Sequence, residues 1–356
     1  MTTLHRLLGT FLLSTFAIDA SAAIFCVGTA AELQNALNTA SGNAQDDTIR
    51  IRAGLYQSSS GGVAFIYSGI EPQSVTLEGG WQLGGGPGTC GSRIDDPSLT
   101  VLDGSSLRIV LWVSGNDGDG DQTVRNLTVR NGFSASDDSG LRAGGFSGYS
   151  GDVVIERVIV HDNVGSIGGG LQVSADGGTL LLSNCLIHGN ACSGLHCAGA
   201  LTVNDYGGAG LPRATIIGNT IVANACTEAA CTLPGLRIGG SAIAAISNNA
   251  FFDHAGPDLR LDAVSHLLNN HLPAFSGIVP SSNSGTVNFA DPGFESPAGD
   301  DYRLRLDSPL IERGASGLPL PALDLAGLPR LNNVHYDIGA YESQAGLFAD
   351  GFETAP

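Results

Sequence analysis

A short apolar phrase recurs five times between residues 122 and 252, and this repetition is the feature that most constrains the fold. The five copies are Val124-Arg-Asn126-Leu-Thr-Val129, Ile155-Glu-Arg157-Val-Ile-Val160, Leu182-Ser-Asn184-Cys-Leu-Ile187, Ile217-Gly-Asn219-Thr-Ile-Val222 and Ile246-Ser-Asn248-Asn-Ala-Phe251. Their first residues are 31, 27, 35 and 29 residues apart. These intervals are too long for a helical heptad, and they indicate a structural repeat.

A second phrase lies between the copies, in which small residues lead into an apolar alternation. It is found at Gly144-Gly145-Phe146, Gly169-Gly170-Leu171, Gly199-Ala200-Leu201 and Pro234-Gly235-Leu236. No segment of these repeats has apolar residues at helical spacing, so each repeat contains strands rather than helices. A propeller blade needs four strands in about 40 to 45 residues, which is more than these intervals hold. The sequence therefore predicts an all-β chain in which each repeat is one coil of a parallel β-helix.

Asparagine occupies the third position in four of the five copies, and Arg157 replaces it in one. In a parallel β-helix, equivalent residues stack at intervals of about 4.8 Å. Stacked amides can then bond to each other and to turn carbonyls. We therefore expect Asn126, Asn184, Asn219 and Asn248 to form one column. The sequence does not fix whether this column points inward or outward.

The chain is strongly acidic, with a formal net charge of -18, and its 16 basic residues are all arginine. The absence of lysine excludes Schiff-base chemistry and a lysine general base. The negative charge disfavours nucleic acid and anionic membranes as partners. It suits a soluble, exported protein, which we expect to be a monomer that binds an extracellular glycan or a cell-surface component.

Residues 1–23 have the pattern of a signal peptide, with His5 and Arg6 before an apolar run and small residues at the cleavage positions. The apolar run is too short for a membrane anchor, and no later stretch is long enough to span a bilayer. We expect the mature chain to begin near Ala23 or Ile24 and to be secreted or displayed on the cell surface.

The seven cysteines of an exported chain predict disulfides. Cys192 and Cys197 share one loop, and Cys226 and Cys231 share the equivalent loop of the next repeat. Each loop can close on itself, or the two can be joined across repeats, and we favour local closure. Cys26 and Cys90 then pair near the N-terminus. The remaining Cys185 is interpreted as a small buried hydrophobic residue rather than a nucleophile.

The rest of the chain predicts additions at both ends of the repeat region. Residues 24–46 include a capping box, Thr29 to Glu32, before apolar residues at helical spacing, which predicts a helix covering the N-terminal end. Residues 47–290 form the parallel β-helix, with Leu267 to Leu272 as a weak sixth copy. Residues 291–342 change in composition and are expected to cap the C-terminal end, because an open last repeat exposes an edge. Residues 343–356 form a tail.

Several segments resemble a known group of proteins. They are Tyr302 to Gly314, Asp324-Leu-Ala-Gly-Leu-Pro-Arg330 and Tyr336-Asp-Ile-Gly-Ala-Tyr-Glu342, together with phrases near the N-terminus. These resemble bacterial secreted right-handed β-helix proteins of the choice-of-anchor Q type, and the repeats are similar to those of polymorphic outer-membrane proteins. The final Leu347-Phe-Ala-Asp-Gly-Phe-Glu353 is similar to tails of exported proteins of Gram-negative bacteria. The resemblance implies a right-handed single-stranded parallel β-helix of the pectate lyase-like kind and an extracellular location; it does not imply a reaction.

The residue after each apolar phrase suggests a candidate site. Arg130, His161 and His188 are expected to stack along one face, with Asp162 beside them. An arginine that neutralises a sugar carboxylate and a histidine that takes a proton could serve a polysaccharide lyase or a glycoside hydrolase acting on an acidic polysaccharide. The alternative is a row of polar residues at a solvent-facing corner. The motifs of polygalacturonases and pectate lyases are absent, so we favour a binding or structural module.

Two further features bear on ligands. Asp117, Asp119 and Asp121 alternate with glycine, a pattern that suits calcium, although a plain acidic turn explains it equally well. The aromatic residues that could stack on sugars are Trp81, Trp112, Tyr149 and Tyr206.

Overall fold

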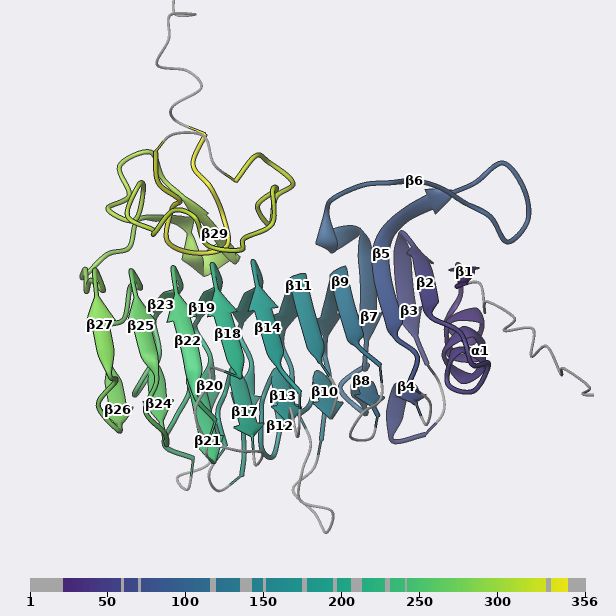
Figure 1. The fold of residues 1–356 in the computed structure, drawn as a ribbon, viewed down its shortest axis with the longest axis horizontal. Helices are drawn as coiled ribbons and strands as arrows, with labels where there is room; N and C mark the ends of the chain where they lie inside the picture. The colour runs from purple at the N-terminus through teal and green to yellow at the C-terminus, as the bar shows by residue number, and fades with distance from the viewer. Residues whose placement is uncertain are drawn as a thin grey trace, which may run out of the picture.

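A computed structural model describes most of the chain, and within it the structure is dominated by parallel β-sheet (Figure 1). The described residues are 22–58, 61–69, 72–115, 120–134, 143–149, 152–174, 178–194, 197–205, 213–227, 231–240, 242–330 and 334–344. The signal-peptide residues before 22, Asp117, Asp119, Tyr206 and the tail from residue 345 lie outside this set, as does the side chain of Tyr149.

The largest sheet in the described part of the chain has 16 strands, and it follows the repeat. Its main path is β1 (Ala23–Val27), β2 (Asp47–Arg52), β5 (Val75–Leu83), β9 (Gln122–Arg130), β11 (Val153–His161), β14 (Leu180–Ser183), β18 (Ala214–Ile217), β22 (Ala244–Ser247), β25 (His266–Leu268) and β27 (Ser282–Ser284). Beside it lie β3 (Gly54–Gln57), β7 (Thr100–Asp103), β15 (Leu186–His188), β19 (Thr220–Val222) and β23 (Ala250–Phe252). All these strands pair in parallel; β6 (Cys90–Arg93) joins the sheet by antiparallel pairing with β5.

A second sheet, of eight strands, faces the first along the molecule. It contains β4 (Val63–Ser68), β8 (Ile109–Ser114), β10 (Phe146–Tyr149), β13 (Leu171–Ser174), β17 (Leu201–Asp205), β21 (Leu236–Gly240), β24 (Leu259–Leu261) and β26 (Phe275–Gly277). A three-stranded sheet of β12 (Val164–Gly165), β16 (Ala191–Cys192) and β20 (Ala225–Cys226) connects them on one side. One continuous apolar core of stacked Val, Leu and Ile side chains runs between the sheets.

The glycine phrases fall in register, because Phe146 pairs with Leu171, Leu171 with Leu201, and Leu201 with Leu236. The small residues before them allow the backbone of adjacent repeats to approach closely. A Cβ atom on Gly144 would lie 2.2 Å from the carbonyl oxygen of Val164. Glycine is therefore a steric requirement of the repeat at this corner.

The apolar phrases also pair in parallel, with one correction to the predicted register. Ile216, not Ile217, pairs with Leu182 and with Ile246. The fourth copy is thus displaced by one residue, and Gly218 takes the position of the asparagine column. Asn219 belongs to the next position and was wrongly placed in that column. The physical reason is that glycine, like asparagine, tolerates the left-handed backbone that this position needs, and Gly218 has a φ of 64°.

The N-terminal end is covered as predicted by helix α1 (Ala30–Ala40). The side chain of Thr29 accepts a hydrogen bond from the backbone of Glu32, and Leu33, Ala36, Leu37 and Ala40 are buried. The Glu32 carboxylate binds the Gly28 N–H, one residue before the helix cap. Strand β1 precedes the helix and pairs with β2, so the segment 24–46 is a strand and a helix rather than a helix alone.

The C-terminal segment, residues 291–344, lies over the side of the large sheet rather than over its last repeat (Figure 1). It contains β28 (Phe294–Ser296), the 3-10 turn η2 (Pro297–Gly299) and β29 (Asp301–Leu304). Its apolar residues pack against Leu186, Val222 and Ala250 of the sheet. The sequence predicts that this segment caps the last repeat. It packs on the side of the sheet instead, because these outward-facing side chains are apolar and are stabilised by burial. The last repeat instead replaces core leucines with polar or small residues, as where Asn283 pairs with Leu267.

Three disulfides are present, and they are the pairings favoured from the sequence: Cys26 with Cys90, Cys192 with Cys197, and Cys226 with Cys231. Cys185 is buried within a strand turn, and burial raises the pKa of its thiol to about 12. This thiol is therefore not a nucleophile. No helix in the described residues has the length and apolar character needed to cross a bilayer.

Candidate functional site

A row of polar side chains runs across the large sheet at the position after each apolar phrase. Asp103 pairs with Arg130, Arg130 with His161, and His161 with His188. The next members of the row are Val222 and Phe252, because the displaced fourth copy brings Val222 and not Ala223 into register. We call Asp103, Arg130, His161 and His188 the polar strip. The structure thus brings the predicted residues together on neighbouring strands.

Arg130 is held at one end of the polar strip by Asp103, with 2.9 Å between its Nε and a carboxylate oxygen of Asp103. Asn131 donates a second hydrogen bond to the same carboxylate oxygen, and the backbone of Ser105 donates to the other. Burial alone would raise the pKa of Asp103, but these hydrogen bonds outweigh it and lower the pKa below its ordinary value. Asp103 therefore stays ionised and orients the guanidinium, which is about one-third exposed.

His161 and Asp162 form an imidazole–carboxylate pair in the middle of the polar strip. The Nδ1 atom of His161 lies 2.8 Å from a carboxylate oxygen of Asp162. Asp162 adopts the left-handed backbone, with a φ of 54°, and this places the side chains of two consecutive residues on one side. The contact fixes the ring through Nδ1, so that Nε2 is the atom placed to exchange a proton or bind a hydroxyl group.

His188 lies at the edge of the C-terminal segment and is not at the solvent-facing corner that the sequence suggested. Its ring stacks on that of His161, with centroids 5.0 Å apart, and meets the ring of Tyr302 at 5.3 Å. Burial lowers the pKa of His188 to about 4, and His161 acts in the same direction. His188 is therefore neutral near pH 7. The sequence could not reveal this, because the covering Tyr302 is more than 100 residues away.

Carboxylates surround the exposed part of the polar strip. Asp162 and Asp300 are largely exposed, and Asp300 lies 3.5 Å from His188. Burial, followed by the negative charges of Asp300 and Asp253, raises the pKa of Tyr302 to about 12. With His188 neutral and Arg130 paired, the local charge is negative. The strip offers carboxylate acceptors and an imidazole to hydroxyl groups, and it offers little attraction to an anion.

A second group of titratable residues is buried within the C-terminal segment, in two of the three motifs there that carried the resemblance, Asp324 to Arg330 and Tyr336 to Glu342. Arg330 is fully buried and lies 3.7 Å from Glu342. Asp324 accepts hydrogen bonds from the backbone of Leu328 and Glu342, and Asp337 from that of Glu312 and Ser343. These motifs therefore hold the segment together, a role that sequence reasoning did not assign to them.

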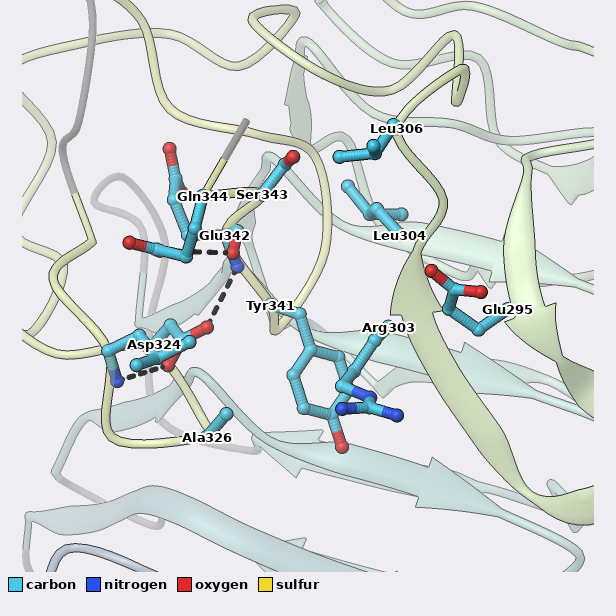
Figure 2. Close-up of a pocket in the computed structure, with 11 residues that line it drawn as sticks. Glu295, Arg303, Leu304, Leu306, Asp324, Ala326, Tyr341, Glu342, Ser343 and Gln344 are labelled. Atoms are coloured by element: carbon cyan, nitrogen blue, oxygen red, sulfur yellow. Dashed lines mark hydrogen bonds between the residues drawn. The ribbon is translucent and has the colours of Figure 1, made fainter. Parts of the chain in front are cut away.

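A pocket of about 390 Å³ adjoins this buried group (Figure 2). Tyr341, Arg303 and Leu304 line it, with Leu306 and Leu328 at its margin. The carboxylate of Asp324 is committed to the Glu342 N–H, as drawn in Figure 2. The guanidinium of Arg303 is paired with Asp301. Asp324 and Arg303 are thus already engaged within the segment, whereas the buried Oε1 atom of Gln344 has no hydrogen-bond partner among the described residues.

Acidic residues that could hold a cation are few in the described part of the chain. Asp121 is exposed, and its predicted partners Asp117 and Asp119 lie outside the described residues, so the calcium prediction stays a prediction. Glu312, Asp337 and Glu342 have carboxylate oxygens within 4.8 Å of one another. Each of these three accepts hydrogen bonds from backbone N–H groups, which explains the cluster without an ion.

Comparisons of the chain with models of protein families, with curated protein sequences and with solved structures found no match. The class of protein is therefore defined by the structure itself. It is an all-β chain of stacked parallel repeats, stabilised by disulfides, with a polar strip beside an accessory C-terminal segment.

Proposed function

We propose that this chain is a secreted or surface-displayed right-handed parallel β-helix that binds an extracellular glycan through the polar strip. Each central repeat contributes strands in turn to the large sheet, the three-stranded sheet and the eight-stranded sheet. This order of strands supports the β-helix. Three disulfides support an oxidising location outside the cytoplasm. The resemblance to secreted β-helix proteins of the choice-of-anchor Q type agrees with the proposed fold. It also agrees with the proposed location, outside the cell or on the outer surface of a Gram-negative bacterium.

The contact between His161 and Asp162 is the observation that carries the binding proposal. It orients an accessible imidazole on a rigid strand, beside Arg130 one strand away at a spacing of about 4.8 Å. Groups spaced in this way along an extended surface suit a polymer of sugar rings. The surplus of carboxylates favours a neutral glycan over an acidic one, because carboxylate oxygens accept hydrogen bonds from sugar hydroxyl groups and repel sugar carboxylates.

Affinity electrophoresis of the purified chain through gels containing different neutral and acidic polysaccharides tests this proposal. We expect retardation by a neutral glycan, and His161→Ala should weaken it at least about tenfold through loss of a positioned polar contact. His266→Ala is the matched control, because His266 is an exposed histidine on the same sheet, far from the strip. Retardation by none of the glycans, or equal retardation of both variants, would contradict the proposal.

The same pair of residues favours one second candidate, a glycoside hydrolase or polysaccharide lyase in which His161 exchanges a proton. Incubation with each retained polysaccharide, followed by assays for new reducing ends and for unsaturated ends, distinguishes it. Turnover that is lost in His161→Ala while retention persists would favour the enzyme. Retention without turnover favours the binding module.

A further inference from the structure

We propose a second ligand site, a pocket for a carboxylated sugar formed by Trp81 and Arg52 at the base of the antiparallel pair of β5 and β6, residues 75–93, which we call the β5–β6 arm. This inference deepens the proposed function, because it assigns a substrate class and a second contact to a glycan-binding chain. The pocket has a volume of about 490 Å³ and is lined by Gly28, Arg52, Ala53, Trp81, Gln82 and Leu83. In Figure 1 its elements lie where β2 and β5 meet the arm that carries β6.

Trp81 is held rigidly within this pocket. Its indole N–H donates a hydrogen bond of 3.0 Å to Glu78, and the guanidinium of Arg50 lies 4.2 Å from the ring centroid. Trp81 also pairs with Arg52 across neighbouring strands. The side chain remains partly exposed. A fixed, partly exposed indole presents an apolar surface with a negative face, which suits the positively polarised C–H groups of a sugar ring.

Arg52 has no close carboxylate partner, in contrast to several other arginines of this acidic chain. Its guanidinium makes no hydrogen bond with any part of the chain that the structure describes, and its nearest carboxylate, that of Glu32, is 3.8 Å away. That carboxylate is already engaged by the Gly28 N–H at 2.7 Å. Arg130 and Arg303, in contrast, are hydrogen-bonded to carboxylates. Among the described residues, the anionic partner of Arg52 is thus this long ion pair with Glu32, and a ligand carboxylate in the pocket can compete for the guanidinium.

The guanidinium of Arg52 packs directly against the backbone at Gly28. A Cβ atom there would lie 1.5 Å from an Nη atom of Arg52, so a larger residue would displace the end of the Arg52 side chain. The disulfide between Cys26 and Cys90 joins strand β1, which precedes Gly28, to strand β6 of the arm beside the pocket. The cation and the indole therefore face the same space from fixed elements, and the pocket is ready for a ligand without rearrangement.

The chemistry of these groups defines the ligand. A planar guanidinium binds a carboxylate through two parallel hydrogen bonds. The amide of Gln82 can bind hydroxyl groups, and the indole covers one side of the ring. A uronic acid residue combines these three features. The polar strip, which is locally negative, lacks this combination, so the two sites would select different sugars.

Tryptophan fluorescence tests the proposal, since the chain has two tryptophans and Trp112→Phe leaves Trp81 as the single reporter. Titration of this variant with trigalacturonic acid should change the emission in a saturable way. Arg52→Gln in the same background should weaken binding at least about tenfold. Arg260→Gln, which alters an exposed arginine on β24 already paired with Asp262, should leave it unchanged. The methyl-esterified trisaccharide, which has the same rings without charge, should bind weakly.

Each other outcome overturns a defined part of the argument. No saturable response in a folded Trp112→Phe chain removes the uronate pocket. Equal binding of the methyl ester removes the role of Arg52. If neutral glycans are still retained and His161→Ala still weakens that retention, the proposed function stands while this inference fails. Thermal unfolding of each variant checks that the fold is retained. Trp81→Phe is a second variant of the pocket, because it keeps an aromatic ring in place of the indole.

Discussion

Two sets of asparagines recur in the repeat, and they make different kinds of contact. One set lies inside the stack. There Asn190 accepts hydrogen bonds from the backbone and side chain of Asn163, and it donates to Asn224. A parallel internal ladder joins Asn219, Asn249 and Asn270. These residues are fully buried and bond repeat to repeat.

The other set is the column that the sequence made conspicuous, and it points away from the core. Asn184 donates to the carbonyl oxygen of Leu323, Asn248 to that of Ala315, and Asn269 to that of Arg313. All three have positive φ values between 50° and 56°. This outward column therefore docks the C-terminal segment, whereas the internal ladders hold the repeats together. Residue type alone does not distinguish docking asparagines from ladder asparagines. The left-handed backbone of the docking asparagines does, because it turns their side chains away from the core.

The comparison predicts its largest effect for Asn190→Ala. The change removes the acceptor of two hydrogen bonds from Asn163 and the side-chain amide that donates to the carbonyl groups of Val160 and His188 inside the stack. Unsatisfied buried groups cost about 1–3 kcal/mol each, so we expect a loss of about 3–5 kcal/mol in the free energy of unfolding. Equilibrium unfolding in urea, followed by circular dichroism, measures it.

Asn184→Gly is the matched control in the same repeat. It removes one hydrogen bond of 2.8 Å to the C-terminal segment while glycine keeps the left-handed backbone, and we expect a loss of about 1 kcal/mol. Equal losses for the two variants would show that the internal and outward columns are energetically equivalent, contrary to the distinction drawn from their positions.

An intermediate effect is expected for Arg157→Met, at the position where arginine interrupts the outward column. The guanidinium of Arg157 donates to the carbonyl oxygens of Asp324 in the C-terminal segment and Asp95 after the arm. Methionine keeps the length but loses both bonds, and we expect a loss of about 2 kcal/mol that falls mainly on the segment. Limited proteolysis should cut residues 291–344 faster while the repeats stay resistant. Glu156→Gln is the neighbouring control, and faster cutting throughout the chain would contradict a local role.

The smallest effect concerns pH and the buried group that completes the docked segment. Burial, followed by the charge of Asp337, raises the pKa of Glu342 to about 9, and burial raises that of Asp337 to about 6. These two carboxyl groups therefore hold more protons in the folded chain than in the unfolded chain in this range. Their contribution to stability is greatest below about pH 4 and falls as pH rises through about 6 for Asp337 and about 9 for Glu342. Thermal unfolding between these values should show the decline.

Glu342→Gln sharpens this test, because it keeps an oxygen for the Asp337 N–H and removes one titrating group. We expect a flatter pH profile and a gain of at least about 1 kcal/mol near pH 9. A variant that loses stability at every pH would show instead that the charged pair with Arg330 supports the segment.

Much of the fold was accessible from the sequence because it depends on local repetition. Strand phrases of fixed composition, recurring at similar intervals, predicted parallel pairing, and the pairs Phe146–Leu171 and Ile155–Leu182 confirm it. The capping residues of α1 and the spacing of the loop cysteines are likewise short-range features. The single error in register arose because Gly218 can replace asparagine at a left-handed position, and a pattern based on side chains overlooks this.

The sequence by itself determined the repeat, the N-terminal helix and the alignment of Arg130, His161 and His188, because each follows from periodicity or from contacts a few residues apart. Only the tertiary structure decided what covers them. The burial of His188 under Tyr302, the bridge of Arg157 to Asp324 and the meeting of Arg52 with Trp81 join residues from different repeats or from the far end of the chain. Such contacts depend on how an accessory segment packs on the repeats, and apolar side chains such as Val222 and Ala250 direct that packing without leaving a periodic signal.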